Sequence, residues 1–253
     1  MSVKLLGVPA SHPVLAVELM LRHKGIAYTR RDLPSMSQRL LLPLLRWPER
    51  TVPALTLHGR RVQTTMKIAR ALDEFQPEPR LVPDDARVLE AEKWADDVLQ
   101  DNARWVCVWA AKQDPSSVLP IALASRLAMP KALLRVTMPV LAPLILSTAK
   151  VPDQGTEKRL AELPAHLDRV DAWLGSGVLG GSQPTAADFQ VATSLRLLML
   201  LEQVRPHLEG RAAGHFALDL APDYPGAFGP VLPEAWLTPL RAEKSRLSQE
   251  IPR

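Results

Sequence analysis

One stretch, residues 50–75, constrains the fold more than any other part of this sequence. It contains a Val-Pro pair at residues 52–53, an apolar run, the turn dipeptide His58-Gly59, the short segment Arg61-Val62-Gln63-Thr64-Thr65 and a helical pattern over residues 66–75. This order predicts a strand, a tight turn, a second strand and a helix. Because proline has no backbone N–H, Pro53 suits the entry of the first strand, where a cis peptide bond is also tolerated.

The start of that helix is a candidate anion-binding site. Thr64, Thr65 and Met66 would present backbone N–H groups that have no partner inside the helix. Such groups, beside hydroxyls and at the positive end of the helix dipole, suit a carboxylate. The same threonines also suit plain helix capping, and one residue can do both. A strand entered through proline, a hairpin and an anion-binding helix start together indicate a thioredoxin-like site for a peptide thiol.

Residues 1–80 alternate between strand and helix patterns. Gly25 marks the end of the first helical pattern. Combined with the hairpin and helix above, the periodicity gives the order βαβαββα, an α/β domain with one small mixed sheet and helices on its faces. The additional expected elements are strands over residues 3–8 and 26–32, a helix over 14–24, and a short helix or loop over 36–46.

The second expected domain, residues 86–253, shows helical periodicity and almost no strand pattern, so the fold class is an α/β domain followed by an all-α domain. A proline-rich linker over residues 77–85 separates the two. From Asp219 onward the chain is rich in proline and is expected to wrap the surface without regular structure. The clearest helical patterns are residues 86–112, residues 156–174, and a capping-box start at Thr185 and Asp188.

Composition excludes several classes of protein. The chain has a formal net charge of +4 and one cysteine, Cys107, so no disulfide can form within it. Cys107 lies in an apolar run and is expected to be a buried small hydrophobe rather than a reactive thiol. The basic residues form no stripe interleaved with aromatics, so no nucleic-acid binding is expected. No metal site is expected either, and the N-terminus lacks the pattern of a signal peptide, which favours a cytoplasmic location.

The most apolar segment runs over residues 116–149. It carries Arg126, Lys131 and Arg135 and is interrupted by prolines. No uncharged window reaches the roughly 20 residues that cross a bilayer, so we expect no membrane span. The segment is longer than a connection between helices needs. We therefore expect a buried or pocket-lining helix that enlarges or caps an apolar pocket.

Four motifs, taken in order, resemble those of the cytosolic glutathione transferase superfamily. Residues 11–28, which begin Ser11-His12-Pro13 and end with Lys-Gly-Ile-Ala-Tyr, resemble the family's first loop and helix, where a Ser, Tyr or Cys precedes the helix. The resemblance covers the chain to about residue 205. The other three motifs are Thr51-Val52-Pro53-Ala54-Leu55 for the cis-proline strand, residues 65–73 for the Ser-x-x-Ile helix, and residues 181–188 for the buried folding motif of the helical domain.

This resemblance implies a bacterial-type transferase with serine in the catalytic loop, acting in detoxification as a cytoplasmic homodimer. Glutathione would be the co-substrate, and no metal would be needed. Ser11 would donate a hydrogen bond to the glutathione thiolate, although an ordinary helix N-cap is the alternative. His12 is expected to be an exposed loop residue or a neighbour of the helix N-cap rather than an acid–base catalyst. The glutathione-binding residues would be Val52, Pro53, Gln63, Thr64 and Thr65.

A small apolar electrophile would bind between the two domains. The residues expected to line this pocket are Trp105, Trp109, Met129 and Met138. Core packing is the alternative for each of the four.

The chain departs from the family at Thr64 and at Trp47-Pro48, where the family often has Asn-Pro at the end of its second helix. The family usually has Glu or Asp where this chain has Thr64, and that acid holds the glutamyl ammonium of glutathione. Here the contact would come from another residue, with Gln63 as the candidate. Thr64 therefore keeps a second hypothesis open, namely a non-catalytic protein of the same fold that binds an apolar ligand. Ser11 at the expected loop favours the enzyme.

Overall fold

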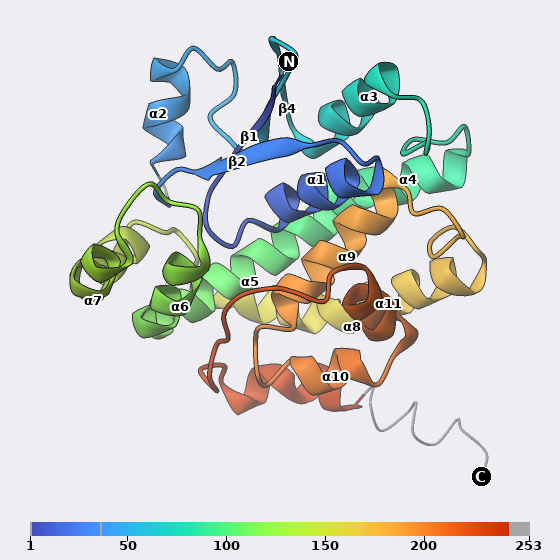
Figure 1. Cartoon of the computed structure of the whole chain (residues 1–253). Coiled ribbons are helices and arrows are strands. Elements are labelled where there is room, and N and C mark those ends of the chain that lie inside the picture. The colour runs from blue at the N-terminus through green and yellow to red at the C-terminus, as the bar shows by residue number, and fades with distance from the viewer. Residues whose placement is uncertain (1, 36, 243–253) are drawn as a thin grey trace.

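The computed structural model describes residues 2–35 and 37–242, and its N-terminal part is a small mixed sheet with helices beside it (Figure 1). Strand β1 pairs with β2 in parallel and with β3 in antiparallel orientation, and β3 pairs with β4 in antiparallel orientation. The sheet order is β2-β1-β3-β4. The elements are β1 (Val3–Gly7), α1 (His12–His23), β2 (Tyr28–Asp32), α2 (Gln38–Leu44), β3 (Ala54–Leu57), β4 (Arg60–Gln63) and α3 (Thr65–Phe75). The predicted order βαβαββα is confirmed.

The hairpin lies where the sequence predicts it. His58 and Gly59 both have positive φ, 48° and 93°, as a two-residue turn between twisted strands requires. The Val52–Pro53 peptide bond directly before β3 is cis. The inner face of the hairpin contributes Leu55, Leu57 and Val62 to a core shared with α1 and α3.

From residue 86 onward the described chain folds into helices and contains no named strand. A continuous rod begins with α4 (Ala86–Trp94), passes through a π-helical turn (Ala95–Leu99) and ends with α5 (Gln100–Gln113). The later elements are a 3-10 turn (Pro115–Ser117), α6 (Val118–Ala124), α7 (Lys131–Ser147), α8 (Asp153–Gly175), α9 (Ala186–Leu198), α10 (Arg205–Glu209), α11 (Ala212–Leu220) and a second 3-10 turn (Glu234–Leu237). Residues 243–253, the end of the second predicted domain, lie outside the described residues, as does residue 36 in the predicted second helix.

Helix α9 is the centre of the molecule. Every residue from Ala186 to Leu198 is buried, and the helix packs against α1 of the first part and against α4, α5 and α11 of the second. The predicted capping box is present at its start. The Asp188 carboxylate accepts hydrogen bonds from the backbone N–H groups of Thr185 and Gly180, both at 2.7 Å. The capped end therefore fixes the helix against which both parts of the chain pack.

Helix α7 does not fit the prediction of a buried segment over residues 116–149. Only Leu134 and Ala142 of this helix are buried, whereas Val136 and Val140 are 75% and 71% exposed. The cause is its position, because α7 contacts α5, α6 and the first 3-10 turn on one side only and projects at the edge of the molecule (Figure 1). No helix in the described ranges is long and apolar enough to cross a bilayer.

Candidate functional site

Three loops meet at one end of the sheet, where β1 and β4 end and β3 begins. The strand register pairs Leu6 with Ala54, and Ala54 with Gln63. The loop after β1, the residues before β3 and the residues after β4 therefore lie side by side. The sequence-predicted residues that this register brings together are Ser11, Val52, Pro53, Gln63, Thr64 and Thr65.

The hydroxyl of Ser11 is available to a ligand. Ser11 occupies the N-cap position of α1, but its side chain makes no capping hydrogen bond. Pro13 in the first turn has no N–H to offer, which removes one of the usual partners of a cap. The side chain is partly exposed, and it lies at the positive end of the α1 dipole. Ser11 is thus the N-cap residue of α1 by position, but its side chain does not cap the helix, and a ligand contact stays a prediction.

The loop before Ser11 is held in place from two sides. The Tyr224 hydroxyl, from the irregular segment after α11, donates a hydrogen bond of 2.6 Å to the carbonyl oxygen of Ala10. The Arg30 guanidinium reaches the carbonyl oxygen of Val8 at 3.4 Å. Burial raises the pKa of Tyr224 well above its ordinary value, so this hydroxyl keeps its proton and remains a donor.

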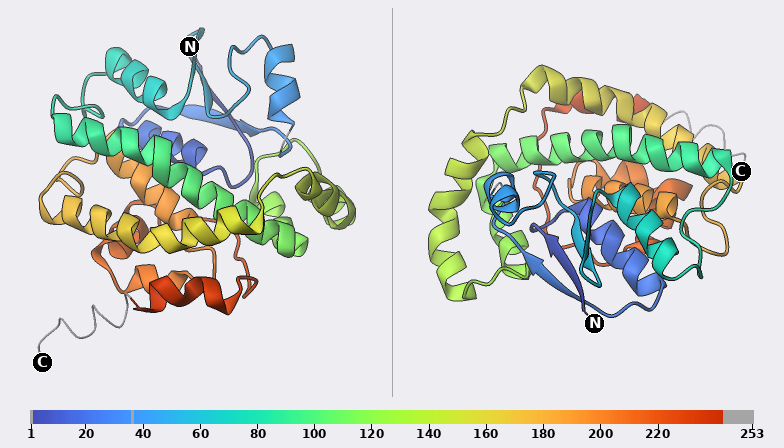
Figure 2. Two further views of the ribbon diagram at one scale, coloured as in Figure 1. Left: turned by 180° about the vertical axis from the view of Figure 1, so that it is seen from behind. Right: turned by 90° about the horizontal axis from the view of Figure 1, so that it is seen from above.

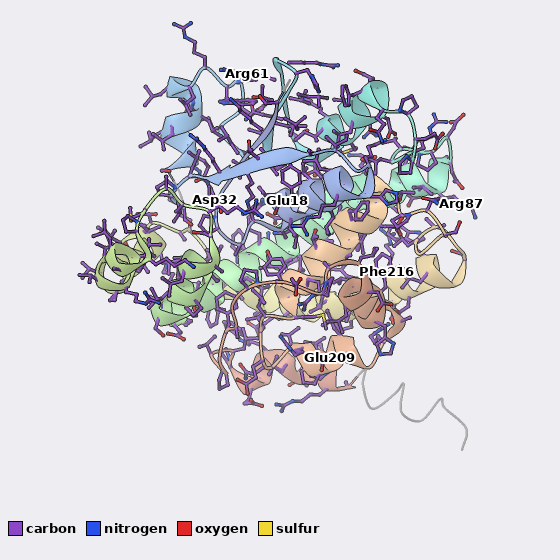
Figure 3. The ribbon with its side chains drawn as sticks, in the orientation of Figure 1. Glu18, Asp32, Arg61, Arg87, Glu209 and Phe216 are labelled. Carbon is purple, nitrogen blue, oxygen red and sulfur yellow. The ribbon has the colours of Figure 1, made fainter. Side chains whose placement is uncertain are left out.

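A buried ionic cluster underlies the same loop. Arg30 pairs with Glu18 of α1 at 2.5 Å and with Asp32 at the end of β2 at 2.9 Å, and Figure 3 shows the two acids at that end of the sheet. The second carboxylate oxygen of Asp32 accepts the backbone N–H of Arg126 at 2.9 Å. This cluster ties the connection between α6 and α7 to the end of the sheet that carries the site.

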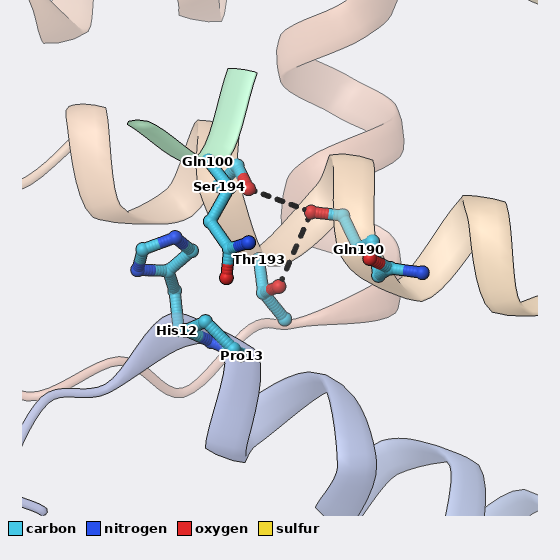
Figure 4. Close-up of a pocket in the computed structure, with 6 residues that line it drawn as sticks. All are labelled: His12, Pro13, Gln100, Gln190, Thr193 and Ser194. Atoms are coloured by element: carbon cyan, nitrogen blue, oxygen red, sulfur yellow. Dashed lines mark hydrogen bonds between the residues drawn. The ribbon is translucent and has the colours of Figure 1, made fainter. Parts of the chain in front are cut away.

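The imidazole of His12 is buried, with 4% of the residue exposed, which corrects the expectation of an exposed loop residue. Figure 4 shows it directed toward Gln100, in a recess completed by Pro13, Gln190, Thr193 and Ser194. Burial and then the charge of Arg104 lower the pKa of His12 from 6.5 to about 3. Its Nε2 has no hydrogen-bond partner in the described chain. The recess has no room for a water molecule, so we interpret it as a tight contact between α1, α5 and α9.

The strand entry and the start of α3 present unpaired backbone groups. The N–H of Val52 has no backbone acceptor among the described residues, and neither have those of Thr65 and Met66. Thr64 adopts φ 69° and ψ 144°, a region that a β-branched residue rarely enters and that costs about 1–3 kcal/mol. Its hydroxyl accepts only a long 3.5 Å contact from the N–H of Lys67. The structure thus places the backbone of Val52, which can pair with an extended peptide, next to the N-terminus of α3, which can bind an anion.

Comparison with known proteins identifies the fold. No family model matches the sequence, and no curated protein sequence is similar to it. Among solved structures, glutathione transferase F2 from Populus trichocarpa matches with a TM-score of 0.58 at 17% identity, over 96% of this chain and 99% of that one. A glutathione S-transferase from Rhodospirillum rubrum F11 matches with a TM-score of 0.56 at 18% identity, over 92% and 97%. The chain has the glutathione transferase fold.

A third structure with this fold carries a ligand. The glutathione S-transferase of Methylobacterium radiotolerans, solved in complex with glutathione sulfonate, matches with a TM-score of 0.53 at 17% identity, over 88% of this chain and 89% of that one. At identities this low, the structural matches show the glutathione transferase fold alone. The reaction has to be inferred from the residues at the site.

Within this glutathione transferase fold, Gln63 has a structural role that the sequence did not indicate. Its amide nitrogen donates to the carbonyl oxygens of Glu49 and Thr51 at 3.0 and 2.9 Å, and its amide oxygen accepts the N–H of Glu49 at 2.8 Å. Gln63 is also buried. It therefore braces the loop that leads to Val52, which corrects the expectation that it replaces the missing acid and contacts an ammonium.

The two tryptophans predicted to line the pocket lie against α8. Trp105 donates to the Thr156 hydroxyl at 3.1 Å and Trp109 to the Asp153 carboxylate at 2.9 Å, both on α8. Nine residues turn an α-helix through about 900°, so Trp109 is on the side of α5 opposite Gln100, which lines the His12 recess. These tryptophans pack α5 against α8, as the core-packing alternative expects, and an electrophile contact stays a prediction for both.

The two methionines occupy different places. Met129 lies in the connection between α6 and α7, two residues after Leu127, which bridges to Asp32 at the sheet edge. Met138 lies in the middle of α7. Both are partly buried.

No pattern in the sequence marks the π-helical turn between α4 and α5. Such turns occur frequently at functional sites. Burial raises the pKa of Asp96 in this turn, and the Gln100 amide donates to its carboxylate at 3.1 Å. Arg104 lies one helical turn beyond Gln100, on the same face. Among the described residues, no three His, Cys, Asp or Glu side chains gather as metal ligands would.

Proposed function

We propose that this protein is a glutathione transferase-like enzyme that uses Ser11 to stabilise the thiolate of bound glutathione for attack on a small apolar electrophile. The observation that carries this proposal is the Ser11 hydroxyl. It is partly exposed, makes no capping bond and lies at the positive end of α1, beside the extended edge at Val52 and the open start of α3. Ser11 would contact the thiol of one small peptide, the Val52 backbone would pair with the peptide backbone, and the start of α3 would bind a carboxylate.

The chemistry requires a moderate shift of the thiol pKa. A free thiol has a pKa of about 8.5, so only a few per cent is ionised at neutral pH. Lowering that pKa by about two units takes roughly 2.7 kcal/mol. A hydrogen bond to a charged group contributes about 1.5–3 kcal/mol and a helix dipole about 0.3–1 kcal/mol. Ser11 and α1 together therefore suffice.

In the proposed reaction the thiolate sulfur forms a bond to the electrophilic carbon, the leaving group departs with its electron pair, and the thiol proton goes to solvent. No protein cysteine takes part. Burial raises the pKa of the Cys107 thiol, and its sulfur donates to the Leu197 carbonyl oxygen at 3.3 Å. His12 is neutral and enclosed, so it supplies no proton to this step.

We propose the following division of labour between the two parts of the chain. Residues 1–80 bind glutathione, with Val52 pairing with its backbone and the N–H groups of Thr65 and Met66 holding a carboxylate. Residues 86–253 supply the apolar side. The candidates for electrophile contacts are Trp105, Trp109, Met129 and Met138. A cytoplasmic homodimer acting in detoxification remains part of this proposal.

A second candidate function has one observation in its favour. Thr64 replaces the acid of the family, and Gln63 is engaged with Glu49 and Thr51. The glutamyl ammonium of glutathione consequently lacks the carboxylate that the family provides at this position. The alternative is a non-catalytic protein of the same fold that binds an apolar ligand.

Calorimetry with reduced glutathione, combined with Ser11→Ala, tests the first proposal. We expect binding in the millimolar range or tighter, retained in Ser11→Ala, and loss in that variant of both turnover and the ultraviolet absorbance of bound thiolate. Ser176→Ala, at the far end of α8, is the matched control and should behave as wild type. Full turnover in Ser11→Ala would show that the proposed mechanism is wrong.

Thr64→Glu distinguishes the two candidates. A carboxylate at this position, at the positive end of α3, would contact the glutamyl ammonium and raise glutathione affinity about tenfold, since one charge-assisted hydrogen bond contributes roughly 1.5 kcal/mol. Thr64→Gln, of similar size but without the charge, is the control. If neither wild type nor Thr64→Glu binds glutathione, the binding-protein function is the better account.

A further inference from the structure

Helix α7 is apolar on both faces although one face is open to water. Its inner face packs through Leu134 and Ala142. Its outer stripe is Leu133, Val136, Val140 and Leu144, which are 47%, 75%, 71% and 64% exposed. The spacing of three and four residues places these four side chains on one line along the helix. A surface helix normally carries charged residues on that line, so the stripe indicates that another surface covers it.

The charge around α7 is of one sign. Residues 115–152 contain four basic residues and no acidic residue. Lys131 is the first residue of the helix, Arg135 lies one turn later, and Lys150 follows its end; all three are exposed. The apolar stripe is therefore bounded at both ends by cations, the pattern of a helix that lies in the interface of an anionic membrane.

Helix α2 lies on the same side of the molecule as α7 (Figures 1 and 2). Leu40 and Leu44 of α2 are 73% and 77% exposed, and Arg39 and Arg46 beside them are exposed as well. Apolar and basic side chains thus occur together on both helices.

We propose that the α7 stripe docks the protein onto the surface of an anionic phospholipid membrane, with the helix lying in the interface and not crossing it. A second copy of the chain fits less well. Antiparallel pairing of two α7 helices would set Lys131 of one against Lys150 of the other, and parallel pairing would set each cation against itself. No acidic residue within 115–152 would offset that repulsion. This inference is independent of the reaction proposed above.

Sedimentation with lipid vesicles tests the proposal on the full chain. Vesicles of phosphatidylcholine alone are compared with vesicles that also contain phosphatidylglycerol, at low and high salt. We expect binding to the anionic vesicles, weaker binding to the neutral ones, and a decrease with salt, because screening shortens the reach of the cations. Val136→Ser/Val140→Ser should weaken binding to anionic vesicles by roughly tenfold or more, since two apolar side chains leave the interface.

Two further variants make the result decisive. Lys131→Glu/Arg135→Glu, which keeps the apolar stripe, should abolish the preference for phosphatidylglycerol. Phe75→Ser/Val98→Ser, at exposed apolar residues outside α7, should bind as wild type does. No binding to either vesicle, or equal loss in this control, overturns the proposal. A dimer in sedimentation velocity that Val136→Ser/Val140→Ser dissociates would also overturn it and assign the stripe to a second copy.

Discussion

Lowering the pH should decrease the free energy of unfolding of this protein, because the buried imidazole of His12 is costly to protonate. The residue is 4% exposed, and its Nε2 has no partner in the described chain. Burial and the charge of Arg104 lower the pKa of His12 from 6.5 to about 3. The groups around it offer no carboxylate, since the recess is formed by Pro13, Gln100, Gln190, Thr193 and Ser194. Protonation therefore places an uncompensated charge in the contact between α1, α5 and α9.

The unfolded chain binds this proton more tightly than the folded chain does. The contribution of neutral His12 to stability is consequently complete above the unfolded pKa of 6.5 and is lost as the pH falls toward about 3. Integrating proton binding between the two states gives a loss of about 2 kcal/mol at a pH near 5 and about 3 kcal/mol at a pH near 4. For a domain of marginal stability this is a large fraction of the total.

Urea denaturation of wild type and of His12→Asn across this pH range measures the effect. The variant should be less stable at neutral pH, because it loses ring contacts, but the difference between the two proteins should shrink by about 3 kcal/mol as the pH falls to about 4. Contributions of other groups, such as His23 and His166, cancel in that difference. A difference that stays constant with pH would refute the assignment of a buried, neutral His12.

Three further predictions follow from single contacts. Asp188→Ala removes the acceptor of two backbone N–H groups at the start of α9 and should lower the free energy of unfolding by about 2–4 kcal/mol in chemical denaturation. Cys107 should react with thiol reagents only after unfolding, because it is buried; rapid labelling of native protein would contradict this. Tyr224→Phe removes the donor to Ala10 and should lower turnover severalfold without weakening glutathione binding, whereas the control Ser176→Ala should leave turnover unchanged.

The elements of this fold were predictable because each has a local chemical signal. Pro53 and the His58-Gly59 turn define the hairpin, Gly25 ends the region of α1, and the pair Thr185 and Asp188 marks the start of α9. Each signal acts within a few residues of the element that it defines. The rod from α4 to α5 was also visible in the periodicity, although the π-helical turn within it was not, since it leaves the apolar pattern almost unchanged.

The partners of the site residues were not predictable from such local signals. Trp105 and Trp109 appear as an apolar stripe in the sequence, and only the placement of α8 shows that their indole N–H groups bond to Thr156 and Asp153. Tyr224 lies in a proline-rich segment without periodicity, so nothing in the sequence brings it to Ala10. The exposure of α7 was missed for the same reason, because an apolar run predicts burial whether or not the fold provides a partner.

Backbone conformation gives an independent reason to place the site at this end of the sheet. Among the described residues, four non-glycine residues have positive φ: Ala10, Arg46, His58 and Thr64. His58 is accounted for by its hairpin turn and Arg46 by the end of α2, where a left-handed residue is common. Ala10 is accounted for by a turn after Pro9, which the N–H of Ser11 closes on the carbonyl oxygen of Val8 at 3.3 Å. Thr64 has no such local reason, and the pairing of β3 with β4 sets it beside the Val52–Pro53 bond. Strained residues persist where surrounding structure imposes them, and they cluster at functional sites. The strained Thr64 beside Val52–Pro53 therefore supports the proposed site independently of the comparisons.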